Sequence, residues 1–267
     1  MLNFCLMKTG CSCRKMEKRL VMGTEKTDLY RRGIWNIKIW IGLGLVFTVL
    51  NPGNDSESRS PYWFSELILY GLMLAGLWAN AKYDLRKKIC IPRKLAPAAY
   101  ILLVWLFGMM FEVSLTVTGE GIGGLHAETL PSFILAQGDY IPIAIISYLA
   151  IRRTQASFQE IFFFAGGKSL TEGLIFTGVL TSVLFSPMFF LSPIVLAYYT
   201  IAYASFIALP LLFMDEELLW KNPTRGKQRS IPYFWFLGFC LALAIRIFWG
   251  LVYSPLVTQL FHLSLSS

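Results

Sequence analysis

Charged residues are scarce in this chain, and histidine is almost absent. Asp, Glu, Lys and Arg make up 15% of the 267 residues, and only two residues are histidine. A soluble domain is closer to one quarter charged. The charges stand between long apolar runs, and 55% of all residues are hydrophobic. This pattern argues against a soluble domain and predicts an all-α, polytopic bundle of transmembrane helices.

Sequence signatures of several enzyme classes are also missing. The chain has no HExxH zinc motif, no serine nucleophile elbow and no Asp-rich lipid-phosphate pattern. Residues 166–169 (GGKS) end like a phosphate-binding loop, but Phe162 stands where that loop needs its first glycine. We therefore assign no catalytic residue, metal ligand or cofactor, and we favour a function other than catalysis.

Seven apolar runs approach the length of about 20 residues that a membrane-spanning helix needs. The predicted spans are 34–50, 62–81, 98–118, 132–151, 173–190, 193–213 and 231–253. Together they form a transmembrane domain over residues 34–253. A basic segment (1–33), expected to be disordered, precedes this domain, and a short uncharged tail (254–267) follows it.

Lys and Arg are distributed unequally between the predicted loops. With a cytoplasmic N-terminus, the four inner segments hold 8, 6, 3 and 4 of these residues, and the outer segments hold only Arg59. Cytoplasmic loops of membrane proteins are enriched in Lys and Arg. We therefore predict a cytoplasmic N-terminus, an external C-terminus and a location in the inner or plasma membrane of the cell.

The same distribution bears on the expected partners. The net charge of +8 is accounted for by the inner loops and is no sign of nucleic-acid binding. The partners that the composition favours are the lipid bilayer, another membrane protein or a second copy of the chain.

The mixed segment 152–172 joins the fourth and fifth predicted spans. Its aromatic run, residues 161–164, is too short to cross a bilayer and is flanked by Glu160, Lys168 and Glu172. Such a segment predicts a helix that lies at the membrane interface.

Three ionisable residues fall deep within the predicted spans. Glu112 lies in the third span, Asp139 in the fourth and Arg246 in the seventh. With a rise of about 1.5 Å per residue, the three lie at nearly the same depth in the outer half of the bilayer. Charges at such depth are costly and are usually paired or functional. We predict that Arg246 pairs with Glu112, with Asp139 or with both.

Small residues share helix faces with two of these charges. Gly238, Ala242 and Arg246 recur every four residues in the seventh span, and Gly108 and Glu112 have the same spacing in the third. Residues four apart lie on one face of a helix, and small residues let two helices approach closely. We expect both faces to point into the bundle.

The fourth span also carries a helix-weakening sequence. Gln137 and Gly138 precede Asp139, and Pro142 follows it, which predicts a kink or a break near the middle of the span. Broken helices line the substrate sites of many transporters; an ordinary proline kink is the alternative. The candidate binding residues, which include a histidine of an outer loop, are Glu112, Gln137, Asp139, Arg246 and His126.

Several functions agree with these features. The best match is a small-molecule or ion permease in which Glu112 or Asp139 carries a proton and Arg246 is the counter-charge. The alternative is a non-catalytic assembly or scaffold protein, in which the buried charges only fix helix packing. A membrane-embedded enzyme that uses His126 is a third.

Overall fold

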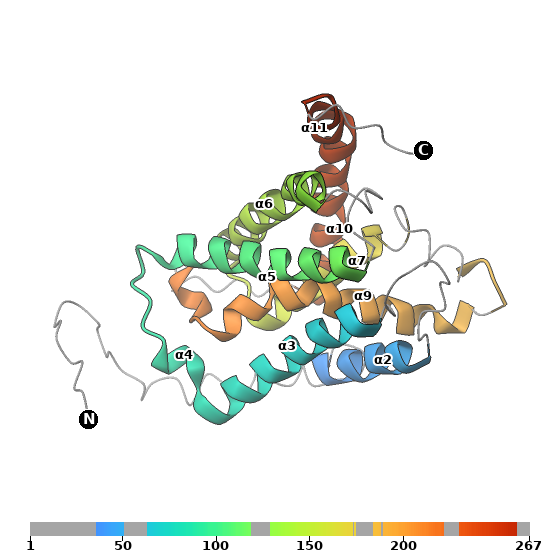
Figure 1. The fold of residues 1–267 in the computed structure, drawn as a ribbon. Coiled ribbons are helices and arrows are strands. Elements are labelled where there is room, and N and C mark those ends of the chain that lie inside the picture. Colours follow the sequence, from blue (N-terminus) through green and yellow to red (C-terminus); the bar gives the residue numbers. More distant parts are fainter. Residues whose placement is uncertain are drawn as a thin grey trace. The chain divides into compact units, whose positions relative to one another are not determined.

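The computed structural model describes residues 36–50, 63–118, 129–172, 174, 184–187, 189–221 and 230–260. The chain divides into two units, Met1–Asn36 and Ile37–Ser267. All described residues except Asn36 belong to the second unit. The described part is all-helical, with no strand (Figure 1). The predicted basic N-terminal segment and His126 lie outside the described residues.

The second unit is built from helices of very different length. Its α-helices are α2 (Ile37–Leu50), α3 (Trp63–Tyr83), α4 (Leu85–Lys88), α5 (Ala96–Thr118), α6 (Thr129–Thr154), α7 (Phe158–Thr171), α9 (Ser192–Ile207), α10 (Ile231–Phe248) and α11 (Ser254–Leu260). Short 3₁₀ segments are η3 (Phe189–Leu191), η4 (Leu209–Leu212) and η5 (Glu216–Leu218). A π-helical segment, η6 (Trp249–Tyr253), joins α10 to α11.

Four described helices are long and apolar enough to cross a membrane, which supports a membrane protein. They are Ala96–Val113, Phe133–Thr154, Phe189–Ile207 and Ile231–Leu260. They correspond to the third, fourth, sixth and seventh predicted spans. The first two predicted spans correspond to α2 and α3, while most of the fifth lies outside the described residues. The count of seven and the orientation of the termini therefore remain predictions.

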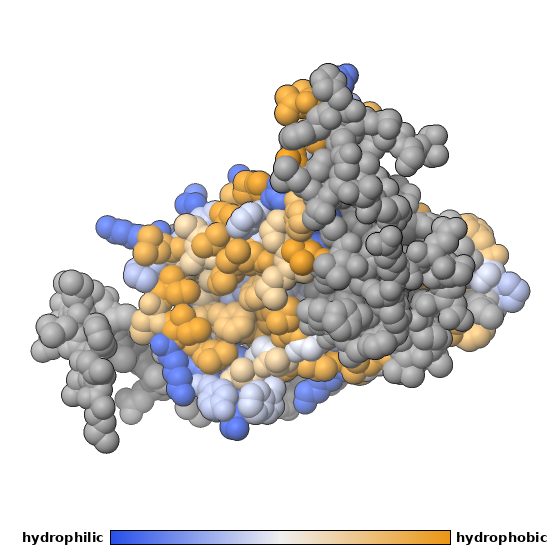
Figure 2. Space-filling model, in the orientation of Figure 1, coloured by the Kyte–Doolittle hydropathy of each residue, from blue (hydrophilic) through white to orange (hydrophobic). Residues whose placement is uncertain are grey.

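The surface of α5 is what a lipid-facing helix requires. One side is buried and carries Tyr100, Val104 and Gly108 at four-residue spacing, and the other side exposes Leu102 and Leu106. A helix that is apolar on its exposed side as well belongs in a membrane rather than in water. Figure 2 shows hydrophobic residues over much of the described surface on one face of the molecule.

Helices α7 and α9 form the centre of the second unit. Helix α7 packs mainly against α10 and α9, and α9 also contacts α2, α3 and α5. Helix α6 packs along α5, and its other contacts include the end of α10 and η6. Figure 1 shows this arrangement, with α9 running between α5 and the pair α2 and α3. The central position of α7 decides the environment of its charged residues.

A tight turn reverses the chain between α6 and α7. Gln155 has a positive φ of 59°, and its N–H donates to the carbonyl of Ile151, which ends α6. Ser157 then begins α7 with a capping box: its side chain accepts from the N–H of Glu160, whose carboxylate accepts from the N–H of Ser157. This reciprocal pair satisfies two N–H groups at the start of the helix.

The prediction of an interfacial helix for this segment is wrong. Every residue of α7 from Glu160 to Ser169 is buried, including the aromatic run Phe162, Phe163 and Phe164. An interfacial helix would keep its polar face in contact with water. Here α9 and α10 cover the helix, so Lys168 lies in the interior.

Candidate functional site

Four charged side chains from three helices meet inside the second unit. Asp139 comes from α6, Lys168 and Glu172 come from α7 and the turn after it, and Arg246 comes from α10. Their side chains are 2, 0, 4 and 10% exposed, respectively. These four residues are called the charge cluster below.

Each cation of the charge cluster lies close to both acids. Lys168 Nζ donates to Asp139 Oδ2 at 2.9 Å and to Glu172 Oε1 at 3.1 Å. Arg246 donates from Nη2 to Glu172 Oε1 at 2.6 Å, and the same nitrogen lies 3.9 Å from Asp139 Oδ2. Two positive and two negative charges thus alternate around a ring, which has no formal net charge. Buried charges require such partners, because desolvation of an isolated one is costly.

Two glycines bring α7 and α10 into backbone contact beneath the charge cluster. A Cβ on Gly167 would overlap the carbonyl oxygen of Trp235, and a Cβ on Gly238 would overlap that of Phe164. Thr171 adds a hydrogen bond from its hydroxyl to the carbonyl of Phe239 at 3.2 Å. Only glycine permits an approach this close. This approach sets the distance between Glu172 and Arg246 one to two turns further along.

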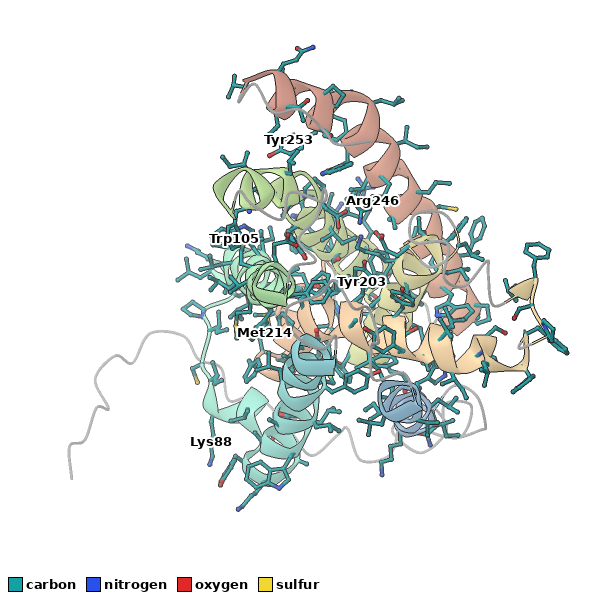
Figure 3. The ribbon with its side chains drawn as sticks, turned by 45° about the vertical axis from the view of Figure 1, so that its right-hand side comes forward. Lys88, Trp105, Tyr203, Met214, Arg246 and Tyr253 are labelled. Carbon is teal, nitrogen blue, oxygen red and sulfur yellow. The ribbon has the colours of Figure 1, made fainter. Side chains whose placement is uncertain are left out.

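Aromatic rings enclose the two cations. Lys168 Nζ lies 4.7 Å from the centre of the Tyr203 ring on α9, and the guanidinium of Arg246 lies 5.7 Å from the Trp249 ring. Both distances suit cation–π attraction. Figure 3 shows Arg246 and Tyr203 on α10 and α9, in the interior where these helices approach α7.

Glu112 forms a second buried polar contact next to the charge cluster. It is fully buried, and its Oε2 accepts a hydrogen bond of 3.2 Å from the hydroxyl of Tyr140. Tyr140 follows Asp139 directly in α6, and its ring packs on Gly108, where a Cβ would overlap it. The face of Gly108 and Glu112 therefore points into the bundle, towards α6.

Two of the predicted binding residues lie in the charge cluster, and a third, Gln137, lies between α6 and α5. Asp139 and Arg246 both belong to the charge cluster, at 3.9 Å from each other, but Arg246 lies closer to Glu172, at 2.6 Å. Gln137 accepts from Trp105 Nε1 at 2.7 Å and donates to the carbonyl of Phe133 at 2.8 Å. Gln137 thus ties α6 to α5.

Lys168 and Glu172 are the members that the sequence interpretation missed. The sequence interpretation placed Lys168 in the cytoplasmic segment 152–172, because the apolar run before it is too short to span a membrane. One signal was present: the two residues are four apart, the spacing at which oppositely charged side chains meet on a helix.

The backbone is irregular on all three helices that carry the charge cluster. Pro142 lies inside α6, Glu172 lies in a π turn at the end of α7, and η6 begins three residues after Arg246. The predicted break in α6 does not occur, because the helix is continuous from Thr129 to Thr154. Pro142 still withholds an N–H from the carbonyl of Gly138. Single π turns are rare and often lie at functional sites.

The π-helical segment η6 anchors α10 to the first part of α6. Trp249 Nε1 donates to the carbonyl of Leu135 at 2.9 Å, and the hydroxyl of Tyr253 donates to the carbonyl of Ile134 at 2.6 Å. The Tyr253 ring lies against Gly138, where a Cβ would overlap it. These contacts hold Asp139 in α6 close to Arg246 in α10.

Within the described residues, no group of three or more His, Cys, Asp or Glu side chains is arranged to hold a metal ion. Comparisons with protein-family models, with curated proteins and with solved structures give no match to this chain. The chemistry of the charge cluster is therefore the basis for any assignment of function.

Proposed function

We propose that this protein is a multi-pass membrane permease for a small molecule or ion, with the charge cluster as its binding site. The observation that carries the proposal is the ring of two acids and two cations at the meeting point of α6, α7 and α10, with exposures of 10% or less. Ionisable groups within membrane-spanning helices are expensive and commonly mark ion or substrate pathways.

The irregular backbone around the charge cluster supports the same proposal. Pro142, the π turn at Glu172 and the π-helical segment η6 interrupt regular helix hydrogen bonding beside the ionisable groups. Transporters often place their binding sites at such interruptions, because freed backbone groups and movable helix ends lie there.

A second candidate is a non-catalytic partner in a membrane assembly. The observation in its favour is the mutual pairing of the four charges, since a ring that satisfies its own members also suits a device that only fixes packing. In that case the buried charges would determine helix register and would bind nothing.

Native mass spectrometry on the full chain, extracted gently from its own membrane, separates the two candidates. A small ligand that is bound in wild type and lost in Asp139→Asn supports the permease. The matched control is Asp215→Asn, at an exposed acid outside the charge cluster, which should keep the ligand. A stoichiometric protein partner without any small ligand would contradict the permease and support the assembly role.

A further inference from the structure

The members of the charge cluster differ in how accessible they are. The side chains of Asp139, Lys168 and Glu172 are 0 to 4% exposed, whereas that of Arg246 is 10% exposed and borders the Trp249 ring. A molecule that reaches the cluster therefore meets a guanidinium first. A guanidinium favours anions and matches the planar shape of a carboxylate best.

Glu172 already occupies the position that such an anion would take. Its Oε1 accepts from Nε and Nη2 of Arg246 at 2.8 and 2.6 Å, and from Lys168 Nζ at 3.1 Å. A ligand carboxylate that replaced Glu172 would find the same donors. The side chain of Glu172 is thus an internal substitute for the ligand.

The two acids of the charge cluster are held by different backbone. Asp139 lies in the interior of α6, a helix of 26 residues, and binds Lys168 through both carboxylate oxygens. Glu172 follows the last residue of α7 and lies in a π turn. The regular α-helical hydrogen bonding ends at Glu172, whereas it is continuous around Asp139 apart from the N–H that Pro142 lacks. This difference favours Glu172 as the acid that moves and Asp139 as the constant partner of Lys168.

Charge balance then requires a proton. The ring itself is neutral with both acids ionised, so an added anion would give the ring one uncompensated negative charge. One proton taken up by Glu172, as its carboxylate leaves Arg246, restores neutrality. The ionisable groups that face Glu172 among the described residues come from all the packed helices: Lys168, Asp139, Arg246 and Tyr203.

We propose that the charge cluster binds one small monovalent carboxylate together with one proton, and that the ligand replaces protonated Glu172 on Arg246. The inference rests on the proposed permease and names its substrate class. Binding of the anion and protonation of Glu172 are then linked, so the carboxylate binds more tightly as the pH falls.

Isothermal titration calorimetry on the full chain in lipid nanodiscs tests this linkage. The probes are sodium acetate and sodium benzoate, at constant ionic strength and at several pH values where both stay ionised. We expect affinity to rise up to about tenfold for each unit by which the pH falls, with one proton taken up per anion. Proton uptake is read from titrations in buffers of different ionisation enthalpy. Ethylammonium, a cation of similar size, should not bind.

The variant Glu172→Gln gives the most specific result. A neutral side chain at this position no longer competes for Arg246 and needs no proton, so the anion should bind more tightly and with no pH dependence. Asp215→Asn is the control and should keep the wild-type pH dependence. Should Glu172→Gln fold only with benzoate present, that requirement also supports the proposal, and wild-type proton uptake remains measurable.

Three results would overturn the inference: no binding of either carboxylate, binding without proton uptake, or equal pH dependence in Glu172→Gln and wild type. Benzoate uptake into proteoliposomes separates this inference from the proposed function. If benzoate binds but is not transported into the proteoliposomes, that result contradicts the permease and leaves the carboxylate site standing. Transport of a cation or a neutral solute alone would contradict the carboxylate site and leave the permease standing.

Discussion

Arg246 donates from both Nε and Nη2 to one oxygen of Glu172, at 2.8 and 2.6 Å. This contact joins α10 to the end of α7, and it lies beyond the point where Gly167 and Gly238 bring the two backbones together. Two charge-assisted hydrogen bonds to a single buried oxygen form a strong link. The pair therefore serves as the main electrostatic connection between these two helices.

The first prediction concerns the coupling of this pair. Arg246→Leu leaves Glu172 and Asp139 buried with one cation, so the free energy of unfolding should fall by ~3–5 kcal/mol. The double variant Arg246→Leu/Glu172→Leu should lose less free energy of unfolding than the two single variants lose in sum, by at least ~1 kcal/mol. Unfolding in mixed detergent and SDS micelles gives these values. Glu160→Gln, at the other end of α7, is the control: its loss in free energy of unfolding should simply add to that of Arg246→Leu. If the losses of Glu172→Leu and Arg246→Leu also add simply, that result contradicts the pairing.

The second prediction concerns Lys168. Lys168→Met removes the only fully enclosed cation of the cluster and leaves two acids to share Arg246, which should lower the melting temperature in detergent strongly. Adding Asp139→Asn should recover much of the loss, because the unpaired negative charge is then gone. Adding Asp215→Asn, at an exposed site, should recover none. Equal recovery by both second changes would show that Lys168 and Asp139 are not partners.

Two of the four members of the charge cluster, Asp139 and Arg246, could be predicted from the sequence. Asp139 and Arg246 stand inside long apolar runs, so their own helices predict their burial. Lys168 follows an apolar run of only a few residues, and its burial depends on α9 and α10, which are distant in sequence.

The helical class was predictable because composition determines it, whereas the count of spans depends on boundaries. Apolar runs of about 20 residues can bury their backbone polar groups in a membrane only as helices. The segment of α7 shows the limit of this reasoning. Its aromatic run looks too short to span, yet neighbouring helices cover all of it. Hydropathy averages report contact with lipid and miss burial among other helices.

The third prediction concerns the close approach of α7 and α10. A Cβ on Gly167 would overlap backbone atoms of α10, which cannot rotate away as a side chain does. Gly167→Ala should therefore cost ~1–3 kcal/mol or more through overpacking. Gly71→Ala is the matched control, because that helical glycine has nothing within 4 Å of its added Cβ. It should be neutral or stabilising by up to ~1 kcal/mol. Similar melting temperatures for both variants would contradict the contact.

The fourth prediction concerns the π-helical segment η6. Tyr253→Phe and Trp249→Phe each remove one hydrogen bond to a carbonyl of α6, at Ile134 and Leu135. The tyrosine change should cost ~0.5–1.5 kcal/mol, the usual net value of one hydrogen bond. The tryptophan change should cost more, because it also replaces the indole ring next to Arg246 by a smaller phenyl ring, which is a weaker cation–π partner. Thermal unfolding in detergent measures both, and a larger loss for Tyr253→Phe would be the contrary result.

The fifth prediction separates Glu112 from the charge cluster. Tyr140→Phe removes the hydroxyl that donates to the buried carboxylate of Glu112, at a cost of ~1.5–3 kcal/mol for a bond to a charged group. The same change in a Glu112→Gln background should cost less, because a hydrogen bond to a neutral amide stabilises the fold less than one to a carboxylate. Tyr148→Phe is the control: its hydroxyl accepts from Arg152 at an exposed position, and its loss should cost under ~0.5 kcal/mol. If Tyr140→Phe cost the same in both backgrounds, its hydroxyl would not stabilise an ionised Glu112.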